Sequence, residues 1–161
     1  METEQEGRRA SCTSGKAILR IGPRVRVMLV RDRGPIYVRP LSSSGEVDAL
    51  LREEMLSSDR ERFLALLLNG KNKLLGIEEV SKGSLGASIV HPRELFKAAI
   101  LANAAAIICA HNHPSGDPTP SAEDRRITER LRRAAEVLGI PILDHVVIGD
   151  PSFYSFADNG W

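Results

Sequence analysis

The sequence predicts a protein of the α/β or α+β class, and three observations lead to this expectation. Short apolar or alternating segments follow one another in turn with longer segments of helical periodicity. The chain has 161 residues, 42% hydrophobic and 27% charged, which is typical of one globular domain. It contains no internal repeat or low-complexity block. We therefore expect a flexible polar tail over residues 1–23 and a single domain over residues 24–161.

The first half of the chain predicts two strands, a helix and a hairpin. Residues 24–30 (RVRVMLV) alternate and then become apolar, as a strand does, and residues 35–44 resemble a second short strand and a loop. Residues 44–56 place apolar side chains at helical spacing behind a serine, which predicts a helix. In residues 60–86 an apolar run precedes the turn sequence NGKN, so we expect a hairpin whose first strand is buried on both faces.

The second half predicts two helices that alternate with strands. Residues 91–104 begin a helix, since proline suits its first turn, and residues 104–111 form an apolar run typical of a central strand. Residues 121–139 give the clearest helix, which ends at a glycine, and residues 141–149 predict a further strand before the closing segment 152–161. One face of the clearest helix carries Ile127, Leu131, Ala134, Ala135 and Leu138.

Composition restricts the classes of partner and compartment. The formal net charge of +1 argues against a strongly basic nucleic-acid surface, although a local patch is compatible with it. The two cysteines, Cys12 and Cys109, cannot form a disulfide framework and suit a reducing compartment. No apolar run approaches the ~20 residues of a membrane span, and the first residues lack the apolar core of a signal peptide. We expect a cytoplasmic protein without membrane contact.

Residues 111–124, HNHPSGDPTPSAED, combine two histidines, a proline-rich loop and a helix start. If residues 104–111 form a strand, His111 and His113 point to the same side with Cα atoms ~7 Å apart, close enough to share one ion. Ser121 starts the next helix, and Asp124 in its first turn can reach the same ion. Three protein ligands leave a fourth tetrahedral position to water, as in catalytic zinc sites.

A structural interpretation explains the same residues without a metal. Ser121 and Asp124 have the spacing of an N-terminal capping pattern, and the prolines can simply shape a loop. His111 and His113 could form a packed polar edge. The conjunction of all these features favours a metal site.

The same residues resemble a known motif. His111, His113, Ser121 and Asp124 match the His-x-His-x7-Ser-x2-Asp core of JAMM/MPN+ metalloproteases. Together with VHPREL upstream and GIPILDHVVIGD downstream, they look like the RadC family, long labelled DNA repair proteins, over about residues 59–161. The resemblance implies a JAMM/MPN-type fold, a mixed sheet flanked by helices and related in architecture to cytidine deaminases. It also implies a Zn²⁺ ion held by His111, His113 and Asp124.

The resemblance further implies two catalytic residues. In JAMM enzymes an upstream glutamate takes the proton from the attacking water, and Glu61 stands where the family pattern puts it. The motif serine, here Ser121, helps to stabilise the oxyanion. Glu78 and Glu79 are rivals for the glutamate, and Glu61 could instead be an exposed residue that pairs with a neighbouring arginine.

Other residues have open roles. Cys109 faces the same way as His111 on a regular strand, but a free cysteine in an apolar run is more often a core residue than a ligand. His145 could orient a ligand, contact substrate or simply be a buried, hydrogen-bonded histidine. His91 fits a helix start. The five arginines within residues 125–136 form either a solvated face or a phosphate-contacting surface.

Two functions are therefore in competition. The first is a zinc-dependent hydrolase of JAMM type that acts on a peptide or isopeptide bond in a protein or peptide substrate. The alternative is a DNA repair or recombination factor that binds nucleic acid, with a structural or vestigial metal. Longer RadC proteins carry an N-terminal helix-hairpin-helix region, and nothing like it fits in residues 1–23. A nucleobase deaminase is disfavoured, because the chain lacks His-x-Glu with Pro-Cys-x-x-Cys.

Overall fold

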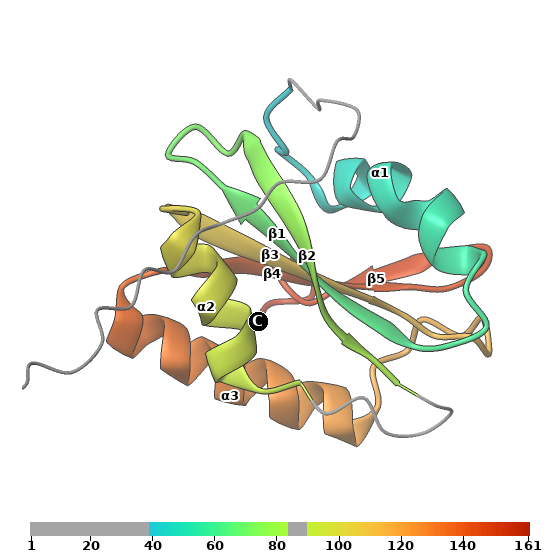
Figure 1. Cartoon of the computed structure of the whole chain (residues 1–161). Coiled ribbons are helices and arrows are strands. Elements are labelled where there is room, and N and C mark those ends of the chain that lie inside the picture. Colours follow the sequence, from blue (N-terminus) through green and yellow to red (C-terminus); the bar gives the residue numbers. More distant parts are fainter. Residues whose placement is uncertain (1–38, 84–89) are drawn as a thin grey trace, which may run out of the picture.

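The computed structural model describes residues 39–83 and 90–161, which form a mixed sheet flanked by helices (Figure 1). The expected tail, the expected strand at residues 24–30 and residues 35–38 of the next expected segment lie outside the described residues. The described elements place the domain in the α+β class, as expected. In chain order they are α1 Ser44–Leu56, β1 Arg62–Leu68, β2 Leu74–Lys82, α2 Pro92–Leu101, β3 Ala106–Asn112, α3 Ala122–Leu138, β4 Ile142–Ile148 and β5 Phe153–Ser155.

The sheet has the strand order β2-β1-β3-β4-β5, with β3 in its centre. The expected hairpin is confirmed, since β1 and β2 pair antiparallel across a turn in which Asn72 adopts a φ of 54°. β1 and β3 also pair antiparallel, and β3 and β4 pair parallel through the crossover helix α3. This crossover brings the carboxyl end of β3 and the first turn of α3 to the same edge of the sheet.

Helices cover the sheet on both faces, with α1 on one side and α2 and α3 on the other (Figure 1). Alternation along β1 and β3 divides their side chains between two apolar clusters. The cluster under α2 and α3 includes Phe63, Ala65, Leu67, Ile107, Cys109, Leu95, Phe96, Leu131 and Ala135. The cluster under α1 includes Val47, Leu51, Met55, Leu64, Leu66, Leu68, Ile108, Ala110, Val146 and Ile148. β1 is therefore buried on both faces, as its continuous apolar sequence predicted, and so is β3, the expected central strand.

Helix α3 is amphipathic and ends where the sequence predicted. Leu131 and Ala135 are buried against the sheet, whereas Leu138 in the last turn is 45% exposed. Gly139 follows with a φ of 68°, a left-handed conformation that glycine adopts without strain. Among residues 39–83 and 90–161, no helix combines the length and apolar character needed to cross a membrane.

Candidate metal centre

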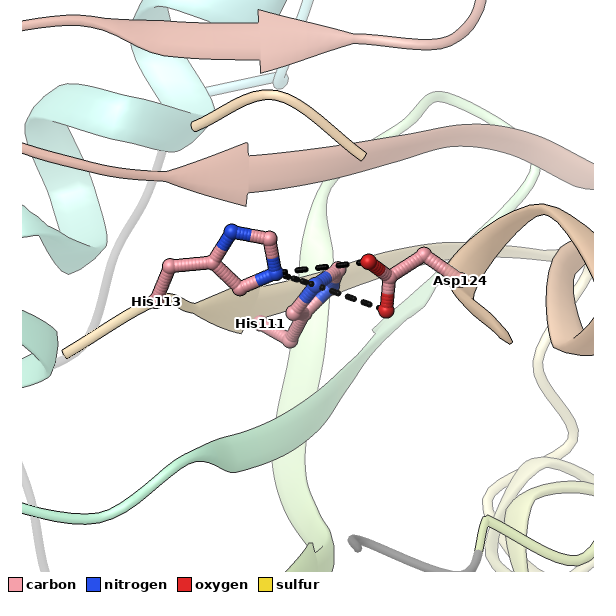
Figure 2. Close-up of side chains that lie close together, drawn as sticks. All are labelled: His111, His113 and Asp124. Carbon is pink, nitrogen blue, oxygen red and sulfur yellow. Dashed lines mark hydrogen bonds and ion pairs between the residues drawn. The ribbon is translucent and has the colours of Figure 1, made fainter. Parts of the chain in front are cut away.

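Three potential ligands from two elements converge at the carboxyl edge of β3 (Figure 2). His111 lies at the end of β3, His113 directly follows the strand, and Asp124 lies in the first turn of α3. The two Nε2 atoms of His111 and His113 are 3.0 Å apart. Asp124 Oδ1 is 3.2 Å from Nε2 of His111, and Oδ2 is 3.3 Å from Nε2 of His113.

These separations fit ligands around a single small cation. With metal–ligand bonds of about 2.0–2.1 Å and tetrahedral angles, neighbouring ligand atoms are ~3.3 Å apart. Two imidazole nitrogens and a carboxylate oxygen also suit Zn²⁺ and related transition metals chemically. The residues therefore could hold one metal ion and leave a coordination position to water or substrate.

The backbone explains why the two histidines face the same side. The backbone N–H of His113 donates to the carbonyl of Ile148 (3.0 Å), so the pairing with β4 continues one residue beyond β3. His113 thus keeps the strand alternation and shares the side of His111. The chain then turns at Gly116, which has a φ of 84° and donates its N–H to the carbonyl of His113 (2.9 Å).

The proline-rich loop after His113 rests against the end of β4. Asp150 donates its backbone N–H to the carbonyl of Gly116 (2.8 Å). At Gly149 an added Cβ would lie 2.3 Å from that same carbonyl oxygen and 2.8 Å from the Pro118 ring. The loop can therefore approach β4 this closely only because residue 149 lacks a side chain.

Ser121 and Asp124 form a reciprocal capping box at the start of α3. Ser121 Oγ accepts the backbone N–H of Asp124 (3.1 Å), and Asp124 Oδ2 accepts the backbone N–H of Ser121 (2.7 Å). The same Oδ2 faces His113. The capping and metal interpretations are thus compatible, since the cap fixes the rotamer that directs Asp124 towards the histidines.

The charges of the cluster favour a cation. Burial alone would raise the pKa of Asp124, but the close contacts with His111, His113 and Ser121 outweigh it and hold that pKa far below its usual range. The pKa of His113 is raised, chiefly by its hydrogen bond to Asp124, against the opposing effect of burial. Asp124 therefore remains a carboxylate, and in the absence of a metal a proton on His113 is its counter-charge.

Each histidine of the pair has a second hydrogen-bond partner on its other ring nitrogen. Nδ1 of His113 donates to the backbone carbonyl of Asp117 (2.7 Å), because a carbonyl can only accept. Nδ1 of His111 lies 2.8 Å from Nε2 of His145. Such partners on the non-ligating nitrogen are the usual surroundings of metal-binding histidines. His145, whose role the sequence left open, thus contacts the cluster directly.

Two contributors to the site escaped the sequence interpretation. Thr128 Oγ1 lies 2.7 Å from Nδ1 of His145. Thr128 is four residues after Asp124 on the same helical face, and this spacing is the sequence signal that could have identified it.

The second contributor is Asn112, between the two histidines, whose side-chain amide bonds the backbone of the segment before β1. Its Oδ1 accepts the N–H of Arg62 (2.8 Å), and its Nδ2 donates to the carbonyl of Arg60 (3.0 Å).

Asn112 thereby anchors the backbone on both sides of Glu61 beside the cluster. The negative charge of Glu61 contributes to the raised pKa of His113, although less than Asp124 does. Arg62, one of the expected partners of Glu61, instead forms ion pairs with Glu54 (2.7 Å) and Glu79 (2.5 Å). The structure thus places Glu61 near His113, and its role as a base stays a prediction.

Cys109 and His91, two other residues considered as possible ligands, have structural roles instead. Cys109 is 1% exposed within the apolar cluster under α2 and α3, and burial raises the pKa of its thiol well above the usual range. It is therefore a neutral core residue, which is the expected alternative to a ligand. His91 caps α2, where its Nδ1 accepts the backbone N–H of Arg93 (3.1 Å).

A groove of about 290 Å³ opens beside His113. It is bounded by the end of α1, by the loop after β3 and by the segment after β4. Its lining includes Leu56, Ser58, Asn112, Ser115 and Asp150. The cluster therefore borders a solvent-accessible hollow of mainly polar character.

Comparison with known proteins agrees with the geometry of the site. Residues 41–161 match the family model described as "RadC-like JAB domain". The chain is 49% identical over 145 residues to a protein named UPF0758 from Desulforamulus reducens, covering 90% of this chain and 62% of the relative. It is 54% identical over 119 residues to the UPF0758 protein of Geotalea uraniireducens, covering 74% and 52%.

A third relative, the UPF0758 protein of Trichlorobacter lovleyi, is 44% identical over 151 residues, covering 94% of this chain and 64% of the relative. The chain thus spans between about half and two thirds of the length of these relatives. Their names assign no activity. The family match covers all the described helices and strands and every residue of the cluster. The chain therefore belongs to the RadC-like JAB domain family.

Proposed function

We propose that this protein is a zinc-dependent hydrolase of the JAMM type that cleaves a peptide or isopeptide bond. The observation that carries the proposal is the cluster of His111, His113 and Asp124 next to an open groove, in which each ring Nε2 lies 3.0–3.3 Å from the other ring and from a carboxylate oxygen. Three ligands beside an accessible hollow are typical of catalytic rather than structural zinc sites.

When bound, Zn²⁺ would polarise the scissile carbonyl and make water more acidic. Glu61 would take the proton from that water and deliver it to the leaving amine. Its location beside His113, with the backbone anchored on both sides by Asn112, supports this role. A base held in this way needs little reorganisation before proton transfer.

Ser121 would donate a hydrogen bond to the developing oxyanion. Its Oγ accepts the backbone N–H of Asp124, so the hydroxyl hydrogen is not used by the cap. The side chain is exposed at the start of α3, one turn from the proposed ligand Asp124. Ser121 can therefore cap the helix and contact substrate with different parts of one hydroxyl group.

The groove supports a polymeric substrate. It lies between the end of α1 and the loop after β3, and it is open to solvent. A peptide segment could lie in it and bring a carbonyl to the side of His113. The polar side chains of Ser58 and Ser115 in its lining suit hydrogen bonds to a peptide backbone.

The arginines of α3 give little support to the alternative function, nucleic-acid binding. Three of the five are paired with glutamates of the same helix, as Arg126 with Glu123, Arg132 with Glu136, and Arg133 with Glu129. These pairs reduce the positive potential that phosphates would need. Salt-dependent DNA binding in the micromolar range or tighter would restore this alternative.

The test is an unbiased cleavage assay. Zinc-loaded protein would be incubated with a degenerate peptide library and with isopeptide-linked peptides, with and without chelator, and products would be identified by mass spectrometry. We expect cleavage that the chelator abolishes. Absence of cleavage in both libraries by the zinc-loaded protein would contradict the proposal.

Two glutamate variants make the assay specific. Glu61→Gln should retain zinc but lose about 10²–10⁴-fold in turnover, the usual contribution of a general base. Glu78→Gln is the matched control. Glu78 lies on the outer strand β2, opposite Ala65 of β1, so this variant should leave turnover unchanged. Undiminished turnover in Glu61→Gln would remove Glu61 as the base.

A further inference from the structure

A chain of buried hydrogen bonds leads from the first turns of α3 back to one of the proposed ligands. Thr128 Oγ1 lies 2.5 Å from the backbone carbonyl oxygen of Asp124 and 2.7 Å from Nδ1 of His145. Nε2 of His145 lies 2.8 Å from Nδ1 of His111. Thr128, His145 and His111 are at most 2% exposed, so water is not an alternative partner.

The direction of the first bond follows from the donor inventory. A threonine hydroxyl has one hydrogen, and a carbonyl oxygen can only accept. Thr128 therefore donates to the carbonyl of Asp124, which leaves its oxygen as an acceptor for His145. The hydrogen between Thr128 and His145 must then belong to Nδ1 of His145.

The same reasoning carries the direction to His111. The ring of His145 lies between Phe63 and Phe156, with both ring centroids 5.1 Å away, and such an apolar environment disfavours a charged imidazole. A neutral imidazole with its hydrogen on Nδ1 has a lone pair on Nε2. His145 therefore accepts a hydrogen bond from Nδ1–H of His111.

We propose that Thr128 and His145 are positioning residues that fix the tautomer of His111, so that its Nε2 lone pair faces the metal site. This inference rests on the proposed role of His111 as a metal ligand. We call the chain of contacts from Thr128 through His145 to His111 the relay. Asp124 lies at both ends of it, because its backbone carbonyl contacts Thr128 and its carboxylate contacts His111. The first turns of α3 and the strands β3 and β4 are thereby held in one arrangement.

The relay can be observed directly in metal-free protein. Long-range ¹H–¹⁵N correlation spectra of the histidine rings distinguish hydrogens on Nδ1 from those on Nε2. We expect hydrogen on Nδ1 of both His145 and His111. A wild-type His145 that carries its hydrogen on Nε2 would overturn the proposal.

Thr128→Val removes the hydroxyl without a change in shape. We expect His145 to move its hydrogen to Nε2 and donate to His111, which then must place its own hydrogen on Nε2. Zinc would have to displace that hydrogen, so we expect zinc affinity, measured by competition with a chromogenic chelator, to fall by about 10–100-fold. His145→Phe, which leaves Nδ1–H of His111 without an acceptor, should weaken zinc binding in the same range.

The controls separate the relay from general damage. Thr128→Ser keeps the hydroxyl and should restore both the tautomer and the affinity, whereas Thr119→Val makes the same change at an exposed position and should affect neither. A Thr128→Val variant with wild-type tautomers and affinity would contradict the relay. Neither measurement uses substrate, so a missing hydrolase activity would refute the proposed function and leave this inference unaffected.

Discussion

The amide of Asn112 makes a quantitative prediction about the segment that carries Glu61. This side chain is 1% exposed and forms two hydrogen bonds, from Arg62 N–H at 2.8 Å and to the Arg60 carbonyl at 3.0 Å. Each bond contributes about 1 kcal/mol net, and a backbone group left without a partner costs more when it is partly buried. Asn112→Ala should therefore lower the free energy of unfolding by about 2–3 kcal/mol.

Urea denaturation of the metal-free protein measures this loss. For a domain of this size it corresponds to a fall in Tm of about 10 °C. Zinc content should stay at that of the wild type, since the three proposed ligands do not bond the Asn112 side chain, whereas turnover should fall as Glu61 loses its anchored backbone. Ser115→Ala, on the exposed loop that follows, is the control and should change stability by less than about 0.5 kcal/mol. A loss below about 0.5 kcal/mol in Asn112→Ala would refute the reasoning.

Three further predictions concern the cluster itself. Asp124→Asn keeps the size of the side chain and an oxygen for the Ser121 cap, so the metal-free variant should fold normally but lose stoichiometric zinc in elemental analysis. In metal-free protein the stabilisation from His113 should be complete below its unfolded pKa of ~6.5 and be lost as the pH rises through its raised folded pKa. The difference in unfolding free energy between wild type and His113→Gln, measured in chelator, should therefore shrink as the pH rises above about 6.5, and a constant difference would contradict the ion pair. Zinc at 1,000 times its Kd should stabilise the wild type by about 4 kcal/mol in calorimetry, with no such gain in His113→Ala.

Much of the fold and the cluster could be predicted because the signals are local. His111 and His113 share one side of a strand by simple alternation, and Ser121 with Asp124 follows a capping pattern that fixes a helix start within three residues. A glycine was expected to end α3, and Gly139 does so with a φ of 68°. Each of these features depends on neighbours along the chain.

The remaining parts of the site depend on contacts between distant segments. His145 meets His111 only because β4 pairs parallel to β3, across 34 residues of sequence. Asn112 bonds a segment 50 residues upstream, and nothing in the sequence HNH indicates which backbone its amide would reach. The spacing of Thr128 places it on the same helical face as Asp124, but its partner His145 lies on the separate strand β4. The sequence therefore indicated the proposed ligands, left the role of His145 open and did not indicate Thr128 or Asn112.

The central claim is that His111, His113 and Asp124 hold a zinc ion, and elemental analysis of the purified protein tests it most directly. We predict about one zinc per chain in the wild type and none in His113→Ala, with the fold of the variant checked by circular dichroism. Stoichiometric zinc in folded His113→Ala would contradict the proposed ligand set.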